Sequence, residues 1–181
     1  MKSIGTQTIT TERLKLRRFH IRDVEAVFNN YGSDINVNRY ISFAPCSTLE
    51  SAKEFIEMHI KQYDSNPDFY GWAIILKDKV IGSIGLFNVE KSGQCELGYS
   101  IGSAWWGYGY ATEAAAAVLE FAFQKMQVHR VYASHHIENL ASGKVLEKIG
   151  MHYEGTMGDA QKNQDGTNSD LKLYAVLSTD L

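Results

Sequence analysis

Hydrophobic residues alternate with small or polar residues over most of the stretch from residue 69 to residue 101, and this spacing is typical of β-strands. The alternation is interrupted at residues 77–79 and again at residues 91–94, where polar residues form segments of hairpin length. The pattern therefore predicts an antiparallel meander with strands at 69–77, 80–89 and 95–101.

In two other stretches the apolar residues recur at intervals of three and four, which predicts helices. The helix at 47–65 begins with Ser47-Thr48-Leu49-Glu50, a sequence that fits a capping box. The helix at 111–127 is apolar on most of its circumference, so we expect it to be buried against a sheet. Shorter helices are expected at 23–30 and 139–149, and a short helix followed by a loop at 34–43.

The remaining strand patterns lie at 14–19, 130–135, 151–157 and 170–176. The polar segment 158–169 is expected to be a mobile loop. A meander followed by strand, helix, strand and helix predicts an α/β (α+β) fold, with a mixed, twisted sheet of about six to seven strands and helices on both faces. The length of 181 residues suits a single domain, 1–181, with one continuous core.

Composition argues against several classes of function. The net charge is -3, and charges of both signs are scattered, so we expect no nucleic-acid partner. No stretch approaches the roughly 18 apolar residues of a membrane span, and residues 1–11 lack the apolar segment of a secretory signal. Neither Cys46 and Cys95 nor the six histidines have the spacing of metal ligands. These features predict a reduced, cytoplasmic protein with no metal and no membrane contact.

The stretch from Glu96 to Glu113 reads as a strand, a glycine-rich turn and the start of a helix. Backbone N–H groups and the helix dipole make such a turn a site for an anion such as phosphate, unless the glycines serve only a tight turn. No Lys or Arg occurs between Lys91 and Lys125, so amides rather than cations are expected to hold the anion. The turn lacks the lysine of a Walker loop, and Thr112 stands where a dinucleotide fingerprint needs Gly or Ala.

The chain resembles the GNAT superfamily of N-acetyltransferases, and within it the Rim-type branch that acetylates the N-terminal amine of ribosomal proteins. The resemblance extends over nearly the whole chain and is carried by an ordered set of fragments. These are Thr11-Glu12-Arg13-Leu14-Lys15-Leu16-Arg17, Glu96-Leu97-Gly98-Tyr99, Trp106-Gly107-Tyr108-Gly109-Tyr110-Ala111-Thr112-Glu113-Ala114, Asn139-Leu140-Ala141-Ser142 and Leu146-Glu147-Lys148-Ile149-Gly150-Met151.

The resemblance implies an acetyl-CoA site along this stretch. The superfamily's phosphate loop reads Gln/Arg-x-x-Gly-x-Gly/Ala, so Gly109 and Ala111 match its last two positions and Trp106 departs from its first. The pantetheine arm is expected to pair with the strand that precedes the loop. The implied cofactor-binding residues are Tyr99, Ser100, Ile101, Trp106, Gly107, Tyr108, Gly109, Tyr110, Ala111, Thr112, Asn139 and Ser142.

The resemblance also implies the catalytic groups. Glu96 would act as the base that takes a proton from the ammonium, often through water, because an ammonium has no lone pair for attack. A solvated or turn-capping carboxylate is the other interpretation of Glu96. Ser142 would hydrogen-bond the departing thiolate as general acid, while Asn139 could equally be only a helix cap. His135 and His136 are expected to be structural rather than catalytic.

The implied reaction transfers acetyl from acetyl-CoA to a primary amine, with a protein N-terminus as the first expected acceptor. A small amine such as a polyamine, amino acid or aminoglycoside is the alternative, because the expected substrate walls, residues 23–65 and 158–169, carry no readable specificity code. A CoA-binding protein without turnover is the alternative from another class. The expected quaternary state is a monomer or a homodimer.

Overall fold

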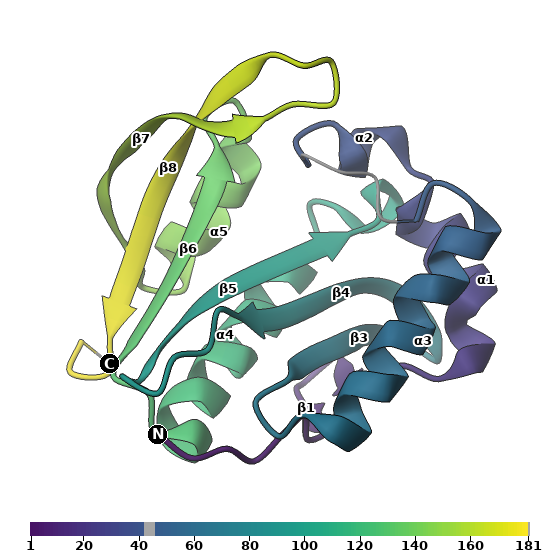
Figure 1. Ribbon diagram of the computed structural model, residues 1–181, viewed down its shortest axis with the longest axis horizontal. Helices are drawn as coiled ribbons and strands as arrows, with labels where there is room; N and C mark the ends of the chain where they lie inside the picture. The colour runs from purple at the N-terminus through teal and green to yellow at the C-terminus, as the bar shows by residue number, and fades with distance from the viewer. Residues whose placement is uncertain (42–45, 181) are drawn as a thin grey trace.

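The computed structural model describes residues 1–41 and 46–180. The strands within these residues are β1 (Ile9–Thr10), β2 (Lys15–Arg17), β3 (Tyr70–Leu76), β4 (Lys79–Phe87), β5 (Gln94–Ile101), β6 (Arg130–His136), β7 (His152–Lys162) and β8 (Asn168–Leu177). They form one eight-stranded sheet in the order β1-β2-β3-β4-β5-β6-β8-β7 (Figure 1). All neighbours are antiparallel except β5 and β6, which are parallel, so the sheet is mixed.

Helices cover both faces of the sheet, as the sequence predicts. They are α1 (Val24–Val27), α2 (Ile35–Asn38), α3 (Leu49–Ser65), α4 (Tyr110–Phe121) and α5 (Leu140–Lys148), and wider π turns continue α1 through Phe28–Gly32 and α4 through Ala122–Met126. Figure 1 shows α1 and α3 in front of the sheet and α4 and α5 behind it. The π turn after α4 ends at Gln127, whose backbone is left-handed.

Alternation along β3 explains how one strand contributes to two hydrophobic clusters. Trp72 and Ile74 belong to the cluster that includes α4, whereas Ala73 and Ile75 belong to the cluster that includes α3. Because successive side chains of a strand point to opposite faces, β3 is buried on both sides and its sequence is apolar almost throughout. β3 is therefore packed against side chains on both faces of the sheet.

Several boundaries differ from the sequence-based expectations; the strand expected at 14–19, for example, is β2 and covers only Lys15–Arg17. The helix cap was predicted at Ser47, but Thr48 is the N-cap: its hydroxyl accepts from the Ser51 N–H, and the Ser51 hydroxyl accepts from the Thr48 N–H, both within 3.0 Å. Glu50 was expected to complete that box, and Ser51 does so instead. The two-residue strand β1 was not predicted, because so short a segment has no visible alternation. The last part of the helix and loop expected at 34–43 lies outside the described residues, and the described part forms α2 and the turn after it.

The loop predicted at 158–169 is wrong for most of its length. β7 continues to Lys162 and β8 begins at Asn168, so only residues 163–167 form the turn, which Asp165 stabilises by accepting from the Thr167 N–H at 2.9 Å. Nearly every residue of β7 is exposed, so its strand pairing leaves no hydrophobic period to detect. The result is a long polar hairpin that projects toward α2 (Figure 1).

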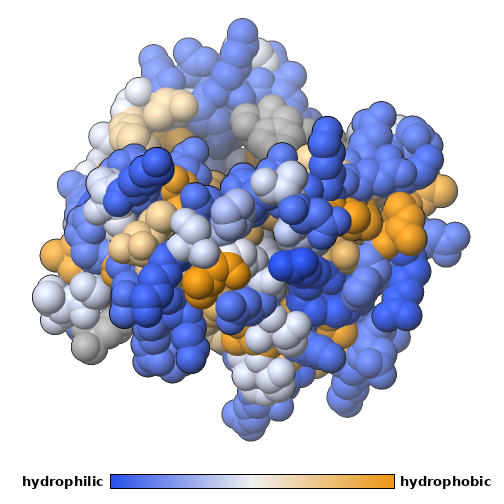
Figure 2. All heavy atoms as spheres, turned by 60° about the horizontal axis from the view of Figure 1, so that its bottom comes forward, coloured by the Kyte–Doolittle hydropathy of each residue, from blue (hydrophilic) through white to orange (hydrophobic). Residues whose placement is uncertain are grey.

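The surface is predominantly polar. Figure 2 shows a face on which hydrophilic residues prevail and apolar residues form small, separate patches. None of the helices in the described ranges has the length and apolar character needed to cross a membrane.

Candidate functional site

The parallel strands β5 and β6 separate along their length, and this split creates the site. They pair at Gln94–Arg130, Cys95–Val131 and Glu96–Tyr132. Both strands continue beyond this point, β5 to Ile101 and β6 to His136, without pairing with each other, so their facing edges diverge while β4 and β8 hold the outer edges (Figure 1). Both strands lie wholly within the described residues. The edge of β5 from Leu97 to Ile101 thus faces the split, where an extended amide chain can hydrogen-bond to it.

A cavity of about 750 Å³ occupies the split. Its walls are the second half of β5, the loop and first turn of α4, the end of β6, the first turns of α5, and α2. Eleven of the residues expected to bind the cofactor line it: Tyr99, Ser100, Ile101, Trp106, Gly107, Gly109, Tyr110, Ala111, Thr112, Asn139 and Ser142. The remaining one, Tyr108, is 62% exposed and stacks on Tyr110 with 5.8 Å between the ring centroids.

The loop before α4 has the backbone shape of an anion site. Gly107 and Gly109 have φ of +82° and +81°, a left-handed conformation that favours glycine. A Cβ at Gly107 would meet no atom within 4 Å, so conformation rather than crowding requires glycine there. Gly109 is the N-cap of α4 and has no side chain to satisfy the first N–H groups of the helix. Those groups, on residues that line the cavity, are available to a phosphate.

A cation from a distant segment reaches the back of this loop. Arg13 donates from Nη1 to the Tyr108 carbonyl at 2.9 Å and from Nε to Glu113 Oε2 at 2.6 Å. The loop therefore has a positive charge close to it, although no Lys or Arg occurs in the stretch of sequence around it. Lys144 of α5 also lines the cavity. Arg13 is not part of the cavity lining, so the expectation that amides rather than cations hold the anion stays a prediction.

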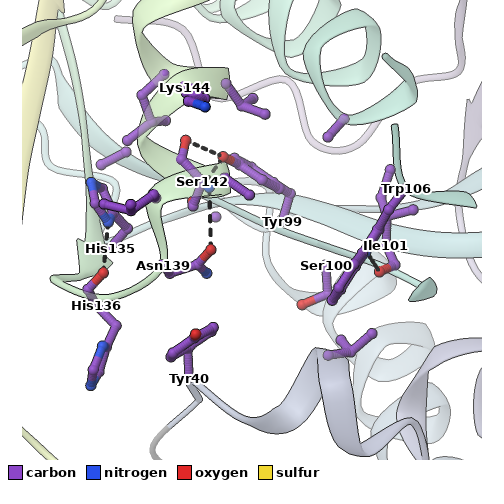
Figure 3. Close-up of a pocket in the computed structure, with 18 of the residues that line it drawn as sticks. Tyr40, Tyr99, Ser100, Ile101, Trp106, His135, His136, Asn139, Ser142 and Lys144 are labelled. Carbon is purple, nitrogen blue, oxygen red and sulfur yellow. Dashed lines mark hydrogen bonds between the residues drawn. The ribbon is translucent and has the colours of Figure 1, made fainter. Parts of the chain in front are cut away.

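Tyr99, Ser142 and Asn139 form a connected group in the wall of the cavity (Figure 3). The hydroxyls of Tyr99 and Ser142 lie 2.9 Å apart, and the Tyr99 hydroxyl also donates to the Ser142 carbonyl at 3.2 Å. Burial raises the pKa of Tyr99 to about 12, so the phenol keeps its proton at neutral pH. Asn139 is the N-cap of α5 and accepts from the Ser142 N–H at 3.2 Å, which confirms its capping role.

Glu96 lies at the closed end of the split. Cys95, Leu97 and Ile101 of β5 pack in the cluster that includes α4, so Glu96, Gly98 and Ser100 point to the opposite face. The Glu96 carboxylate accepts from Asn88 Nδ2 at 2.7 Å. Along β5 the cavity lining begins at Leu97, one residue later, so Glu96 stands beside the cavity rather than in its wall. Glu96 and Ser142 are thus on opposite sides of the sheet.

The two histidines at the end of β6 are both held by backbone groups. His135 Nδ1 lies 2.7 Å from the His136 carbonyl and must carry the proton of that hydrogen bond, and burial lowers the pKa of His135. His136 Nδ1 accepts from the Glu138 N–H at 3.1 Å, so its proton is on Nε2. A structural rather than catalytic role for the two histidines stays a prediction, because both line the cavity and His135 Nε2 is buried with no hydrogen-bond partner among the described residues.

The wall opposite α5 comes from the two segments expected to line the substrate site, 23–65 and 158–169, but sequence reasoning singled out none of its residues. Tyr40 and Val37, from α2 and the turn after it, line the cavity, and the Tyr40 ring lies 5.1 Å from that of His136 (Figure 3). Gln161 of β7 lines it too and donates from Nε2 to the Tyr40 carbonyl at 3.1 Å. No motif marks these residues, because only the folded hairpin brings residue 161 to residue 40. The hairpin and α2 together bridge one side of the split.

The residues present fit an acyl-CoA. The exposed edge of β5 suits the amides of a pantetheine arm, and the left-handed glycines with the start of α4 suit a pyrophosphate. Within residues 1–41 and 46–180 no group of three His, Cys, Asp or Glu side chains is arranged to hold a metal ion. A split mixed sheet with an amide-lined loop at its opening defines the class of protein: an acyl-CoA-dependent transferase.

Comparison with known proteins identifies the family. The family model for the acetyltransferase (GNAT) domain matches residues 13–152, and the chain belongs to this family. It is 31% identical to the uncharacterized N-acetyltransferase p20 of Bacillus licheniformis, over 96% of this chain and 98% of that protein. It is 28% identical to the [ribosomal protein uS5]-alanine N-acetyltransferase of Escherichia coli, over 83% of this chain and 81% of the enzyme.

A solved structure agrees with this assignment. The crystal structure of a GNAT-family acetyltransferase from Bacillus anthracis superposes with a TM-score of 0.83 at 31% identity, covering 96% of this chain and 99% of that one. The predicted GNAT fold is therefore confirmed, with eight strands instead of about six to seven.

Proposed function

We propose that this acetyltransferase moves an acetyl group from acetyl-CoA to the primary amine at the N-terminus of a protein. The observation that carries the transferase part is the split between β5 and β6, with an amide-lined loop at one end and the Tyr99–Ser142 pair in its wall. The acceptor is suggested by the likeness to the uS5-alanine N-acetyltransferase.

The loop from Trp106 to Thr112 would hold the pyrophosphate, and the edge of β5 at Tyr99, Ser100 and Ile101 would hold the pantetheine arm. Acetyl-CoA supplies an activated thioester when bound. Trp106 supports the proposed loop shape, since its Nε1 donates to the Ile101 carbonyl at 2.7 Å and ties the loop to the end of β5.

The chemistry proposed is direct attack of the amine nitrogen on the thioester carbonyl. A C–N bond forms, the C–S bond breaks, and the amine loses a proton. Glu96 is the proposed base and would take that proton through water, because it points to the face opposite α4 and stands just outside the cavity wall. The Ser142 hydroxyl is the proposed donor to the departing sulfur. While it donates there, Tyr99 would turn its single O–H from the Ser142 carbonyl to Ser142 Oγ, 2.9 Å away, and so hold that oxygen in place.

A small amine is a second acceptor class, favoured by the bridge between the hairpin and α2. Gln164 Nε2 donates to the Ile41 carbonyl at 3.0 Å, next to the contact of Gln161 with Tyr40. Together these bonds tie β7–β8 to the segment after α2 and narrow the approach on that side. A slender amine reaches the split more easily through such an opening than a folded chain does.

One screen tests these alternatives. The protein is incubated with acetyl-CoA and a panel of N-terminal peptides, polyamines, amino acids and aminoglycosides, and release of free thiol is followed. Turnover with peptides that exceeds turnover with every small amine supports the first proposal, and the reverse order supports the second. A protein that binds CoA in calorimetry yet releases no thiol with any amine would be a CoA-binding protein without turnover.

A further inference from the structure

The side chain of Arg13 makes three contacts with the phosphate loop and the start of α4, although about a hundred residues separate them in sequence. Besides its bonds to the Tyr108 carbonyl and Glu113, its guanidinium lies 4.7 Å from the centroid of the Tyr110 ring. Its Nη2 is 3.5 Å from where a Cβ of Gly109 would stand. Arg13 is absent from the cavity lining, which includes Gly107, Gly109 and Tyr110, so it stands behind the loop.

The bond to Tyr108 sets the direction of an N–H group. The peptide between Tyr108 and Gly109 is planar and trans, so its C=O and N–H point in opposite directions. Since the carbonyl points to Arg13, the Gly109 N–H points away from it, toward the cavity side. The residues that flank Tyr108, Gly107 and Gly109, are both left-handed glycines, whose peptide planes rotate easily unless something holds them.

The bond to Glu113 pairs a carboxylate whose negative charge would otherwise repel a phosphate bound at the loop. Glu113 lies in the first turn of α4, the same turn whose N–H groups face the cavity. Its Oε1 accepts from the Thr11 hydroxyl at 2.6 Å and from the Arg13 N–H at 2.9 Å, while Oε2 accepts from Arg13 Nε. Partial burial opposes its ionisation, but the hydrogen bonds from Thr11 and Arg13 hold the pKa of Glu113 below its usual value. The carboxylate is thus charged, paired and turned away from the ligand side.

We propose that Arg13 is the positioning residue of the phosphate loop: it orients the Tyr108–Gly109 peptide toward the pyrophosphate and neutralises Glu113 beside it. Arg13 acts from behind the loop and does not itself contact the phosphates. The inference rests on the proposed binding of CoA at this loop. It assigns the Thr11-Glu12-Arg13 segment to donor binding, although the segment lies outside the glycine motif.

The test compares Arg13→Gln and Arg13→Lys with the parent protein. Affinities for CoA, 3′-dephospho-CoA and acetyl-pantetheine are measured by calorimetry or competition, and hydrogen exchange of residues 107–112 is followed without ligand. We expect Arg13→Gln to weaken CoA and dephospho-CoA equally, by about 10-fold or more, the equivalent of one hydrogen bond to a charged group. Acetyl-pantetheine, which lacks the pyrophosphate, should bind as before, and the loop amides should exchange faster. Arg13→Lys should not restore affinity, because an ammonium group keeps the charge but lacks the planar guanidinium that bonds to Tyr108 and Glu113 at the same time.

Arg130→Gln is the matched control, since Arg130 forms a similar ion pair with Glu154 at 2.8 Å and pairs with Gln94 at the start of β5, whereas the loop follows the other end of that strand. It should leave the affinity for CoA unchanged. The proposal is overturned if Arg13→Gln binds CoA as tightly as the parent does, or if it weakens the binding of acetyl-pantetheine by the same factor. It is also overturned if Arg13→Gln weakens the binding of CoA but not of dephospho-CoA, or if Arg13→Lys restores the affinity for CoA in full. A parent protein that fails to bind CoA would instead refute the proposed function.

Discussion

Replacing Gly109 by valine separates ligand binding from folding, and the structure sets the size of both effects. Gly109 has φ +81°, and a Cβ there would meet only Arg13 Nη2, at 3.5 Å, which is an ordinary contact. The cost to folding is therefore mainly that of a β-branched residue in the left-handed region, about 2 kcal/mol. For a chain of this size that lowers Tm by about 4–8 °C and leaves the protein folded.

The cost to CoA binding should be larger. If relaxation of the strained backbone turns away two amide donors, each worth about 1.5–3 kcal/mol to a charged acceptor, the Kd rises by about 10²–10⁴-fold. Calorimetric titration with CoA measures this loss, and circular dichroism on the same sample measures Tm.

Gly166→Val is the matched control for Gly109→Val. Gly166 lies in the β7–β8 turn, has φ +85°, and a Cβ there would meet nothing within 4 Å, so the substitution imposes the same backbone strain away from the loop. It should lower Tm by a similar amount and leave the affinity for CoA unchanged. If Gly109→Val binds CoA as tightly as Gly166→Val does, the loop backbone is not the phosphate site.

Three other predictions concern catalysis and pH. Glu96→Gln should lower kcat/KM by about 100-fold near neutral pH and by less at high pH, where the amine is already deprotonated, and a pH profile parallel to that of the parent would remove Glu96 as the base. Ser142→Ala should lower kcat by about 10- to 100-fold through loss of a hydrogen bond to the departing sulfur, and the defect should shrink with a thioester of a more acidic thiol; an equal defect with both donors would contradict this role. Burial lowers the pKa of His59 from 6.5 to about 4, so the unfolded state takes up a proton first as pH falls, and the free energy of unfolding should drop by about 3 kcal/mol between those values. His59→Leu should remove most of this pH dependence in urea titrations, and an unchanged slope would show that other groups cause it.

The central sheet and the long helices could be predicted from the sequence because packing imposes a period on them. β3, β4 and β5, with α3 and α4, begin and end within a few residues of the predicted bounds. The same reasoning failed for the distal part of the β7–β8 hairpin, residues 158–162 and 168–169, because no residue there is buried and no hydrophobic period marks the strands. It also displaced the cap of α3 by one residue, since Ser47 and Thr48 are both good caps and only the fold selects between them.

The candidate site likewise has a part that the sequence could locate and a part that it could not. The loop at Gly107 and Gly109 could be located because its amides, glycines and helix start are consecutive in the chain. The contacts of Arg13 with the loop, and of Gln161 with Tyr40, join segments about a hundred residues or more apart. No local pattern encodes such contacts, because either partner alone is an ordinary polar residue of the surface.

The placement of Glu96 and Ser142 on opposite sides of the sheet has a consequence for the order of events in turnover. Donor and acceptor would approach the split from different sides, so both have to be present before the acetyl group can move. Cys95, the neighbour of Glu96, is a poor intermediate carrier of the acetyl group, since it is fully buried and burial raises its pKa to about 12. Initial rates measured against both substrates should then give intersecting rather than parallel reciprocal plots, and free CoA should leave only after the acetylated amine has formed.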